Sequence, residues 1–272
     1  MDRRDINNFP RIEGFLMNPK IVVHSLPSLA EPAELSQGTV VVIDILRAST
    51  TIVYALEAGA EAVYPCRDLD EARRMAERMG DNVLLGGERK GLPPQGFDLG
   101  NSPSEYEADR VAGKRIVFTT TNGTLALSRC EKAKRVLIGS FVNATAVYQA
   151  LLTETTAVHM LCAGTDGDYS RDDTLFAGFL VDRLQRRGGL RYDLNAQAVT
   201  ARENWRSSFA EPYVVGAEPI SPEMLAAKLE ETEGGQNLVQ VGLTGDILDA
   251  ARIDKFKSVP ELDVDEFVIR KP

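Results

Sequence analysis

The chain has 272 residues, of which 43% are apolar and 26% charged, a composition typical of a soluble globular protein with room for a substantial core. Its net charge of −9 argues against nucleic acid and anionic membrane surfaces as partners, because both require basic patches. No segment has the roughly 18 apolar residues of a membrane span, and residues 1–20 lack the apolar stretch of a signal peptide. The three cysteines show neither CxxC spacing nor an even count, which indicates a reducing, cytoplasmic location.

Strand-like and helix-like segments alternate along most of the chain. Apolar, β-branched runs predict strands at residues 20–25, 39–45, 61–65, 83–86, 115–120, 135–139 and 157–162. Periodic apolar patterns predict helices at residues 50–58, 68–79, 122–130, 143–152 and 173–187. Strands separated by helices of this length indicate right-handed βαβ units. We therefore expect a three-layer α/β/α fold with a mostly parallel sheet.

After about residue 190 the alternation of strands and helices gives way to mainly helical patterns. Segments 195–208, 221–232 and 235–252 have helical patterns, and a last strand-like run covers 264–269. We expect residues 1–190 to form an α/β core, and residues 191–272 to form a mainly helical C-terminal part that can be integrated with it. Apolar stretches in this part need cover, which favours a homo-dimer.

Four of the predicted strands end in small polar clusters that open a helix. The clusters contain Asp44, Arg47, Ser49 and Thr50; Thr119 to Gly123; Ser140 and Asn143; and Asp166, Asp168, Ser170, Asp172 and Asp173. Carboxyl ends of parallel strands share one edge of the sheet, where ligands bind, and helix N-termini offer backbone N–H groups to an anion there. The pattern therefore predicts an enzyme for a small, negatively charged substrate.

Asp44 and Arg47 follow the apolar run TVVVI. An ionised carboxylate at the end of a buried strand is costly unless it is paired or metal-bound. Asp44 is therefore a candidate metal ligand or a candidate nucleophile, with helix capping or pairing to Arg47 as the plain structural alternative. The Arg47 guanidinium suits a phosphate or a sulfonate.

Residues 87–106 interrupt the alternation with four glycines and three prolines. A loop of this length inside a compact α/β chain is usually functional or disordered. Its polar residues Glu88, Arg89, Asp98 and Asn101 stand among aromatic, glycine and proline neighbours, which favours an ordered functional loop.

The turn formed by Thr120, Thr121, Asn122 and Gly123 has hydroxyls and N–H groups that cradle an anion or simply cap the next helix. In the acidic stretch after the last predicted strand, we expect one or two carboxylates to touch a ligand. Ser170 with Asp173 has the spacing of a capping box.

Several known phosphate-handling motifs are absent. A haloacid dehalogenase requires a second aspartate where this chain has Leu46, and no cysteine has the arginine spacing of a cysteine phosphatase. A P-loop, a dinucleotide-binding GxGxxG after a strand, and the GxSxG of serine hydrolases are also missing.

Five strings in order resemble the 2-phosphosulfolactate phosphatase family of coenzyme M biosynthesis. They are VVVIDILRASTTI, LLGGERKGLPPQGFDLGNSPSEY, GKRIVFTTTNGTLAL, VLIGSFVNATAV and CAGTDGDYSRDDTLFAG, with the weaker GLTGDILDAARIDKFKSVPEL beyond them. The resemblance covers about residues 20–190. It implies a magnesium-dependent phosphatase of α/β/α fold that hydrolyses 2-phospho-3-sulfolactate to 3-sulfolactate and phosphate.

The resemblance and the junctions together define candidate site residues. We expect catalytic roles for Asp44, Arg47, Glu88 and Arg89, substrate binding by Asn101, Thr120, Thr121, Asn122, Gly123 and Ser140, and Mg²⁺ binding by Asp44, Asp98 and Asp166. Mg²⁺ and the arginines would offset charge on the transferring phosphoryl group. A phosphatase for another small phosphorylated hydroxy acid and a non-catalytic anion-binding protein remain the alternatives.

Overall fold

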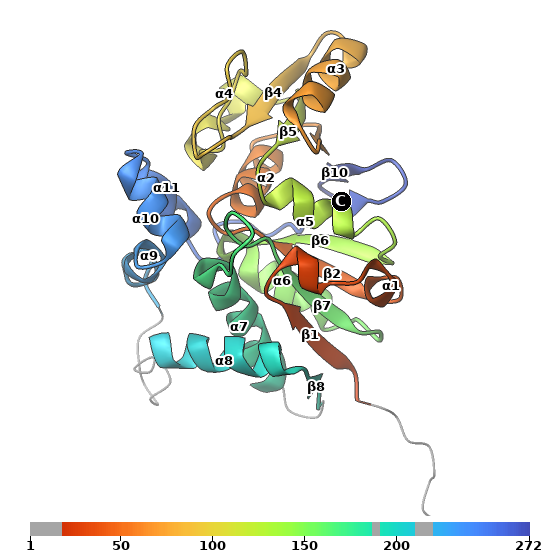
Figure 1. Ribbon diagram of the computed structural model, residues 1–272, viewed down its shortest axis with the longest axis vertical. Coiled ribbons are helices and arrows are strands. Elements are labelled where there is room, and N and C mark those ends of the chain that lie inside the picture. The colour runs from red at the N-terminus through yellow and green to blue at the C-terminus, as the bar shows by residue number, and fades with distance from the viewer. Residues whose placement is uncertain (1–17, 187–190, 210–219) are drawn as a thin grey trace, which may run out of the picture.

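The computed structural model describes residues 18–186, 191–209 and 220–272. In these ranges ten strands form one sheet, in the order β4-β5-β3-β10-β9-β6-β2-β7-β1-β8 (Figure 1). The strands are β1 Lys20–His24, β2 Thr39–Ile43, β3 Ala62–Pro65, β4 Val83–Gly87, β5 Arg115–Thr119, β6 Arg135–Gly139, β7 Val158–Cys162, β8 Asp193–Leu194, β9 Glu261–Asp263 and β10 Val268–Arg270.

The sheet consists of two parallel blocks joined by an antiparallel hairpin. Strands β4, β5 and β3 pair in parallel, as do β6, β2, β7, β1 and β8. The β9–β10 hairpin lies between the blocks and is antiparallel to β6 and β3. The mostly parallel sheet expected from the alternation of segments is confirmed.

Helices cover both faces of the sheet. They are α1 Pro32–Leu35, α2 Ala48–Glu57, α3 Leu69–Met79, α4 Ala108–Val111, α5 Gly123–Arg129, α6 Ala144–Leu151, α7 Arg171–Arg186, α8 Ala196–Ser208, α9 Pro222–Glu230, α10 Glu233–Gln240 and α11 Thr244–Ala250. Successive residues of a strand point to opposite faces. Accordingly Val41 packs in a cluster with α7 residues such as Leu180, whereas Val42 packs in a separate cluster with α2 residues such as Ile52. The α/β/α layering is therefore confirmed.

The C-terminal residues are joined to the rest of the fold. Strands β8, β9 and β10 belong to the common sheet, and α8 crosses α7 so closely that a Cβ on Gly178 would lie 2.1 Å from the Ala201 carbonyl oxygen. Helices α9, α10 and α11 form a group at one side of the molecule (Figure 1), and α11 is joined to α2 by Tyr54, whose hydroxyl donates to the Asp249 carbonyl at 3.1 Å. The boundary that we expected at residue 190 falls in 187–190, outside the described residues.

Of two C-terminal expectations, one is confirmed and one is wrong in detail. Segment 235–252 is mainly helical, as expected, and it is divided into two helices, because Gly242 adopts φ +78° and the Leu243 N–H donates to the Leu238 carbonyl, which ends α10. The strand expected over 264–269 is mostly the turn of the β9–β10 hairpin, in which Asp263 Oδ1 accepts hydrogen bonds from two following backbone N–H groups. No described helix is both long and apolar enough to cross a membrane.

Candidate active site

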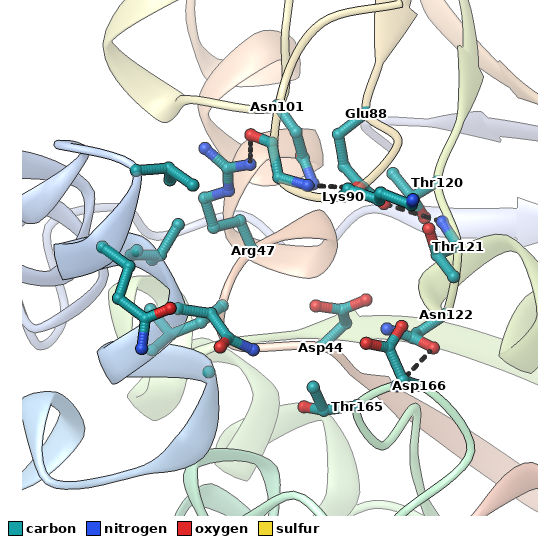
Figure 2. A pocket seen from close by; sticks show the side chains of 17 residues that line it. Asp44, Arg47, Glu88, Lys90, Asn101, Thr120, Thr121, Asn122, Thr165 and Asp166 are labelled. Atoms are coloured by element: carbon teal, nitrogen blue, oxygen red, sulfur yellow. Dashed lines mark hydrogen bonds between the residues drawn. The ribbon is translucent and has the colours of Figure 1, made fainter.

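A cavity of about 300 Å³ lies where the carboxyl ends of β2, β4, β5 and β7 meet α10 (Figure 2). Strand-end segments contribute Asp44, Leu46, Arg47, Glu88, Lys90, Gly91, Asn101, Thr120, Thr121, Asn122, Thr165 and Asp166. The C-terminal part contributes Gly234, Asn237, Leu238, Gln240 and Val241. The parallel topology thus brings side chains from distant segments to one small concave site.

Asp44 lies directly after β2 and both caps α2 and lines the cavity. Its Oδ1 accepts a hydrogen bond from the Ala48 N–H at 3.0 Å, whereas its Oδ2 has no hydrogen-bond partner among the described residues. A Cβ on Gly123 would lie 2.7 Å from Oδ2, so only glycine allows α5 to approach this carboxyl so closely. One carboxylate oxygen of Asp44 is therefore held and the other is available to a ligand.

The pKa of Asp44 is raised from its ordinary 3.8 to about 7. Burial of the carboxyl is the largest cause, and the negative charges of Asp172 and Glu88 add to it. The hydrogen bond from Ala48 and the charge of Arg47 act in the opposite direction. The charge of Asp44 is thus incompletely compensated by the protein itself, as expected of a group that meets a cation or exchanges a proton.

Asp173 accepts backbone N–H groups near Asp44 instead of completing a capping box with Ser170. Its Oδ1 accepts from the Ile45 N–H at 2.8 Å and its Oδ2 from the Gly164 N–H at 3.0 Å. The carboxyl therefore joins the segment after β2 to the segment after β7. Burial, with the nearby charges of Asp172 and Asp44, raises the Asp173 pKa well above its ordinary value.

Arg47 is buried and held by three partners. Its Nη1 donates to Asp246 Oδ2 at 2.7 Å and to Ser102 Oγ at 3.2 Å, and its Nη2 donates to the Gly91 carbonyl at 2.7 Å. These contacts join the segment after β2 to the 87–106 loop and to α11. The guanidinium is therefore fixed in the cavity wall, with part of its charge balanced by Asp246.

The 87–106 loop is ordered around Glu88. The Glu88 carboxylate accepts the Thr121 N–H at 2.7 Å and the Gly91 N–H at 3.0 Å (Figure 2), so it joins the loop to the turn after β5. Arg89 does not line the cavity, because its guanidinium donates to the Glu88 carbonyl and to Thr119 Oγ1. Asp98 is exposed and outside the cavity, where its Oδ2 accepts the Leu85 N–H.

The turn after β5 presents three polar side chains to the cavity. Thr120 Oγ1 accepts the Thr124 N–H, which leaves its own O–H free to donate, and Thr121 is exposed. Asn122 Oδ1 accepts the Asp166 N–H at 3.2 Å (Figure 2), which ties this turn to the segment after β7. Ser140 lies elsewhere: it is fully buried and shares a 2.7 Å hydrogen bond with Thr50 Oγ1.

Of the residues named from the sequence, most meet at the cavity. Asp44, Arg47, Glu88, Asn101, Thr120, Thr121, Asn122 and Asp166 line it, whereas Arg89, Asp98, Gly123 and Ser140 do not. Gly123 still shapes the site, because its backbone lies so close to the Asp44 carboxyl that a Cβ would be 2.7 Å from Oδ2.

Comparison with known proteins identifies the family. The family model described as 2-phosphosulpholactate phosphatase matches residues 24–265. The chain belongs to this family. The resemblance inferred from the sequence strings is confirmed.

Bacterial relatives share much of the sequence, and each is named a probable 2-phosphosulfolactate phosphatase. The protein from Thermotoga maritima is 36% identical over 233 residues, 86% of this chain and 92% of its own. That from Symbiobacterium thermophilum is 40% identical over 232 residues, 84% of this chain and 93% of its own. The match to the Caldicellulosiruptor saccharolyticus protein, 43% identical, spans 54% of this chain and 63% of that relative.

The sequence reasoning missed Lys90, Thr165 and the whole of the α10 wall. Lys90 stands beside two named loop residues, and this proximity is the one local signal that was available. The amides of α10 resemble an ordinary solvated helix face. Asn101, which was named, has a buried Oδ1 with no partner among the described residues. Because such an acceptor is costly when unpaired, a donor or cation from a ligand would satisfy it.

The donor set of the cavity fits a magnesium ion. Mg²⁺ prefers oxygen ligands and usually takes one or two carboxylates together with water and substrate phosphate. Asp44, through its available Oδ2, and Asp166, at the exposed rim, are such carboxylates. Within the described ranges, no three His, Cys, Asp or Glu side chains are grouped closely enough to hold a metal by themselves. Asp98 is not part of this donor set.

Proposed function

We propose that this protein is a phosphoric monoester hydrolase that converts 2-phospho-3-sulfolactate to 3-sulfolactate and phosphate with the help of Mg²⁺. The observation that carries the proposal is the position of Asp44. A buried carboxyl with one unpaired oxygen and a pKa raised to about 7 faces a small cavity lined by hydrogen-bond donors, in a chain of this family. A cavity of about 300 Å³ suits a substrate of this size.

Asp44 and Asp166 would be the protein ligands of the metal ion. Bound Mg²⁺ supplies positive charge to the phosphoryl oxygens while the ester bond breaks. This requirement for a cation follows from charge: Asp44, Glu88 and Asp166 line the site, and an anionic substrate is repelled by carboxylates.

The protein's own groups orient the phosphate. The Thr120 hydroxyl and the Asn122 amide nitrogen are donors on the cavity wall, and Arg47 is fixed nearby by Asp246, Ser102 and Gly91. Groups held in place before the reaction stabilise developing charge without further reorganisation. Glu88 contributes by fixing the loop and the turn, because both of its oxygens already accept backbone hydrogen bonds.

Asp44 acts either as a ligand of the metal or as a nucleophile that forms an aspartyl-phosphate, and two measurements separate these roles. In the second case, acid quenching during turnover traps a phosphoryl group on the Asp44 peptide, which mass spectrometry detects. The configuration at a chiral phosphorus is then retained over two displacements. A single direct attack by water inverts it.

The test of the proposed function is phosphate release from racemic 2-phospho-3-sulfolactate, with and without Mg²⁺, beside the Asp44→Asn variant. We expect release that depends on Mg²⁺ and that Asp44→Asn reduces by at least about a thousandfold, as is usual for a central catalytic group. If the protein releases phosphate only from a different phosphorylated hydroxy acid, the proposed substrate is wrong but the proposed reaction, hydrolysis of a phosphate monoester, stands. The homo-dimer, the cytoplasmic location and the link to coenzyme M remain predictions.

A further inference from the structure

The cavity wall formed by α10 differs in charge from the opposite wall. The acids that line the cavity, Asp44, Glu88 and Asp166, all follow the carboxyl ends of strands. The lining residues of α10 carry no charge, and their polar groups are the side-chain amides of Asn237 and Gln240. In Figure 2 the pale blue ribbon of the C-terminal helices lies across the cavity from Asn122 and Asp166.

Both amides have unused hydrogen-bonding capacity. Asn237 and Gln240 are three residues apart, so they project from the same side of the helix, and both side chains are exposed to the cavity. Neither amide hydrogen-bonds to any residue that the structure describes. By contrast, Gln236 on the same helix lies outside the cavity and donates from Nε2 to the Glu230 carbonyl at 2.7 Å.

The proposed substrate carries the reacting phosphate on its central carbon, between a carboxylate at one end and a sulfonate at the other. Its phosphate would approach Asp44 through the Mg²⁺ that Asp44 and Asp166 would hold, because a cation is needed to offset these carboxylates. Its sulfonate is repelled by the acid-bearing wall and is best accommodated against a wall that has donors and no carboxylates. The three sulfonate oxygens can accept the N–H groups of the two side-chain amides. Hydrogen bonds to a charged acceptor are stronger than bonds between neutral groups.

We propose that Asn237 and Gln240 bind the sulfonate of the substrate and thereby determine specificity for a sulfonated phospho-acid. This inference rests on the proposed function and deepens it. Lys90 also lines the cavity, but Figure 2 shows it beside Glu88 and Thr121, away from α10, so it is not part of this sulfonate site. The C-terminal helices would then supply selectivity, while the strand ends supply the chemistry.

The kinetic test compares 2-phospho-3-sulfolactate with 2-phospholactate, which lacks the sulfonate. In an Asn237→Ala/Gln240→Ala double variant we expect kcat/KM for the sulfonated substrate to fall by about tenfold or more, mainly through KM. The value for 2-phospholactate should change by less than about threefold. Gln236→Ala, on the same helix, should leave the ratio of the two values unchanged. An equal loss on both substrates, or no loss, would overturn the inference.

A binding measurement keeps this inference separate from the proposed reaction. Calorimetry with 3-sulfolactate does not depend on turnover, so it applies even if the protein releases no phosphate from 2-phospho-3-sulfolactate. Weaker binding to the double variant than to wild type and Gln236→Ala supports the inference. Unchanged binding in the double variant, or no binding by wild type, overturns it. Isosteric Asn237→Asp should weaken binding as well, because it replaces a donor by a negative charge without changing the shape of the wall.

Discussion

Arg47 and Asp246 form a buried ion pair, 2.7 Å between Nη1 and Oδ2, that joins the segment after β2 to α11. Both side chains are at most 5% exposed. Removing one partner leaves the other charge buried and unpaired. We therefore expect Asp246→Ala to lower the free energy of unfolding by about 3 kcal/mol or more, and to displace Arg47 from the cavity wall.

Urea unfolding measures the effect, with Glu266→Ala as a control. Glu266 pairs with Arg270 at the surface, where the two side chains are 61% and 46% exposed, so its loss should cost less than about 1 kcal/mol. Equal changes for Asp246→Ala and Glu266→Ala would mean that the buried pair adds nothing beyond an ordinary surface contact.

This pair also marks the limit of what the sequence predicts. The strands and the polar clusters after them follow from local apolar patterns and parallel topology, so Asp44, Thr120 and Asp166 could be placed together. The partner of Arg47 lies 199 residues further along the chain. Nothing in local composition distinguishes Asp246 from another helix-surface acid, because the contact depends on how α11 packs.

The same reasoning explains the misplaced site residues. Asp98 and Ser140 have the residue types expected in a phosphatase site, but each is used by the backbone or a hydroxyl nearby: Asp98 accepts the Leu85 N–H, and Ser140 bonds to Thr50. Asn237 and Gln240 were missed because amides spaced along a helix resemble a solvated surface. The cavity they face exists only after the C-terminal helices have packed on the sheet.

The raised pKa of Asp44 predicts how stability varies with pH in the absence of metal. The unfolded chain loses this proton near 3.8, whereas the folded protein retains it up to about 7. Between these values the unfolded state binds fewer protons, so the free energy of unfolding falls as pH rises. The stabilising contribution of protonated Asp44 is thus full below about pH 4 and lost above about pH 7.

Asp44→Asn cannot ionise but can still accept the Ala48 hydrogen bond. We expect this variant to lose that part of the pH dependence and to be more stable than wild type at pH 8, in metal-free urea titrations at pH 5 and 8. If the difference in unfolding free energy between variant and wild type is the same at both pH values, Asp44 has no raised pKa.

Gly123 is predicted to be essential for the shape of the site. A Cβ there would lie 2.7 Å from Asp44 Oδ2 and 2.6 Å from the Ala48 Cβ. Gly123→Ala should therefore displace the carboxyl, cost about 1–3 kcal/mol of stability, and abolish most phosphate release. Gly245→Ala is the matched control, because a Cβ at Gly245 meets nothing within 4 Å and sits in a helix, where alanine is favoured. Wild-type activity in Gly123→Ala would show that the carboxyl is free to move.

The three carboxylates named as metal ligands from the sequence now have different expected roles. Asp44 and Asp166 line the cavity, whereas Asp98 is used by the Leu85 N–H outside it. A ligand that binds only the folded state stabilises it by about 2.7 kcal/mol at a hundred times its dissociation constant. Thermal unfolding of wild type should therefore shift upward with Mg²⁺, and Asp44→Asn and Asp166→Asn should reduce the shift. Asp98→Asn should keep the full shift although it weakens the loop; loss of the shift in Asp98→Asn alone would place the metal at that loop instead.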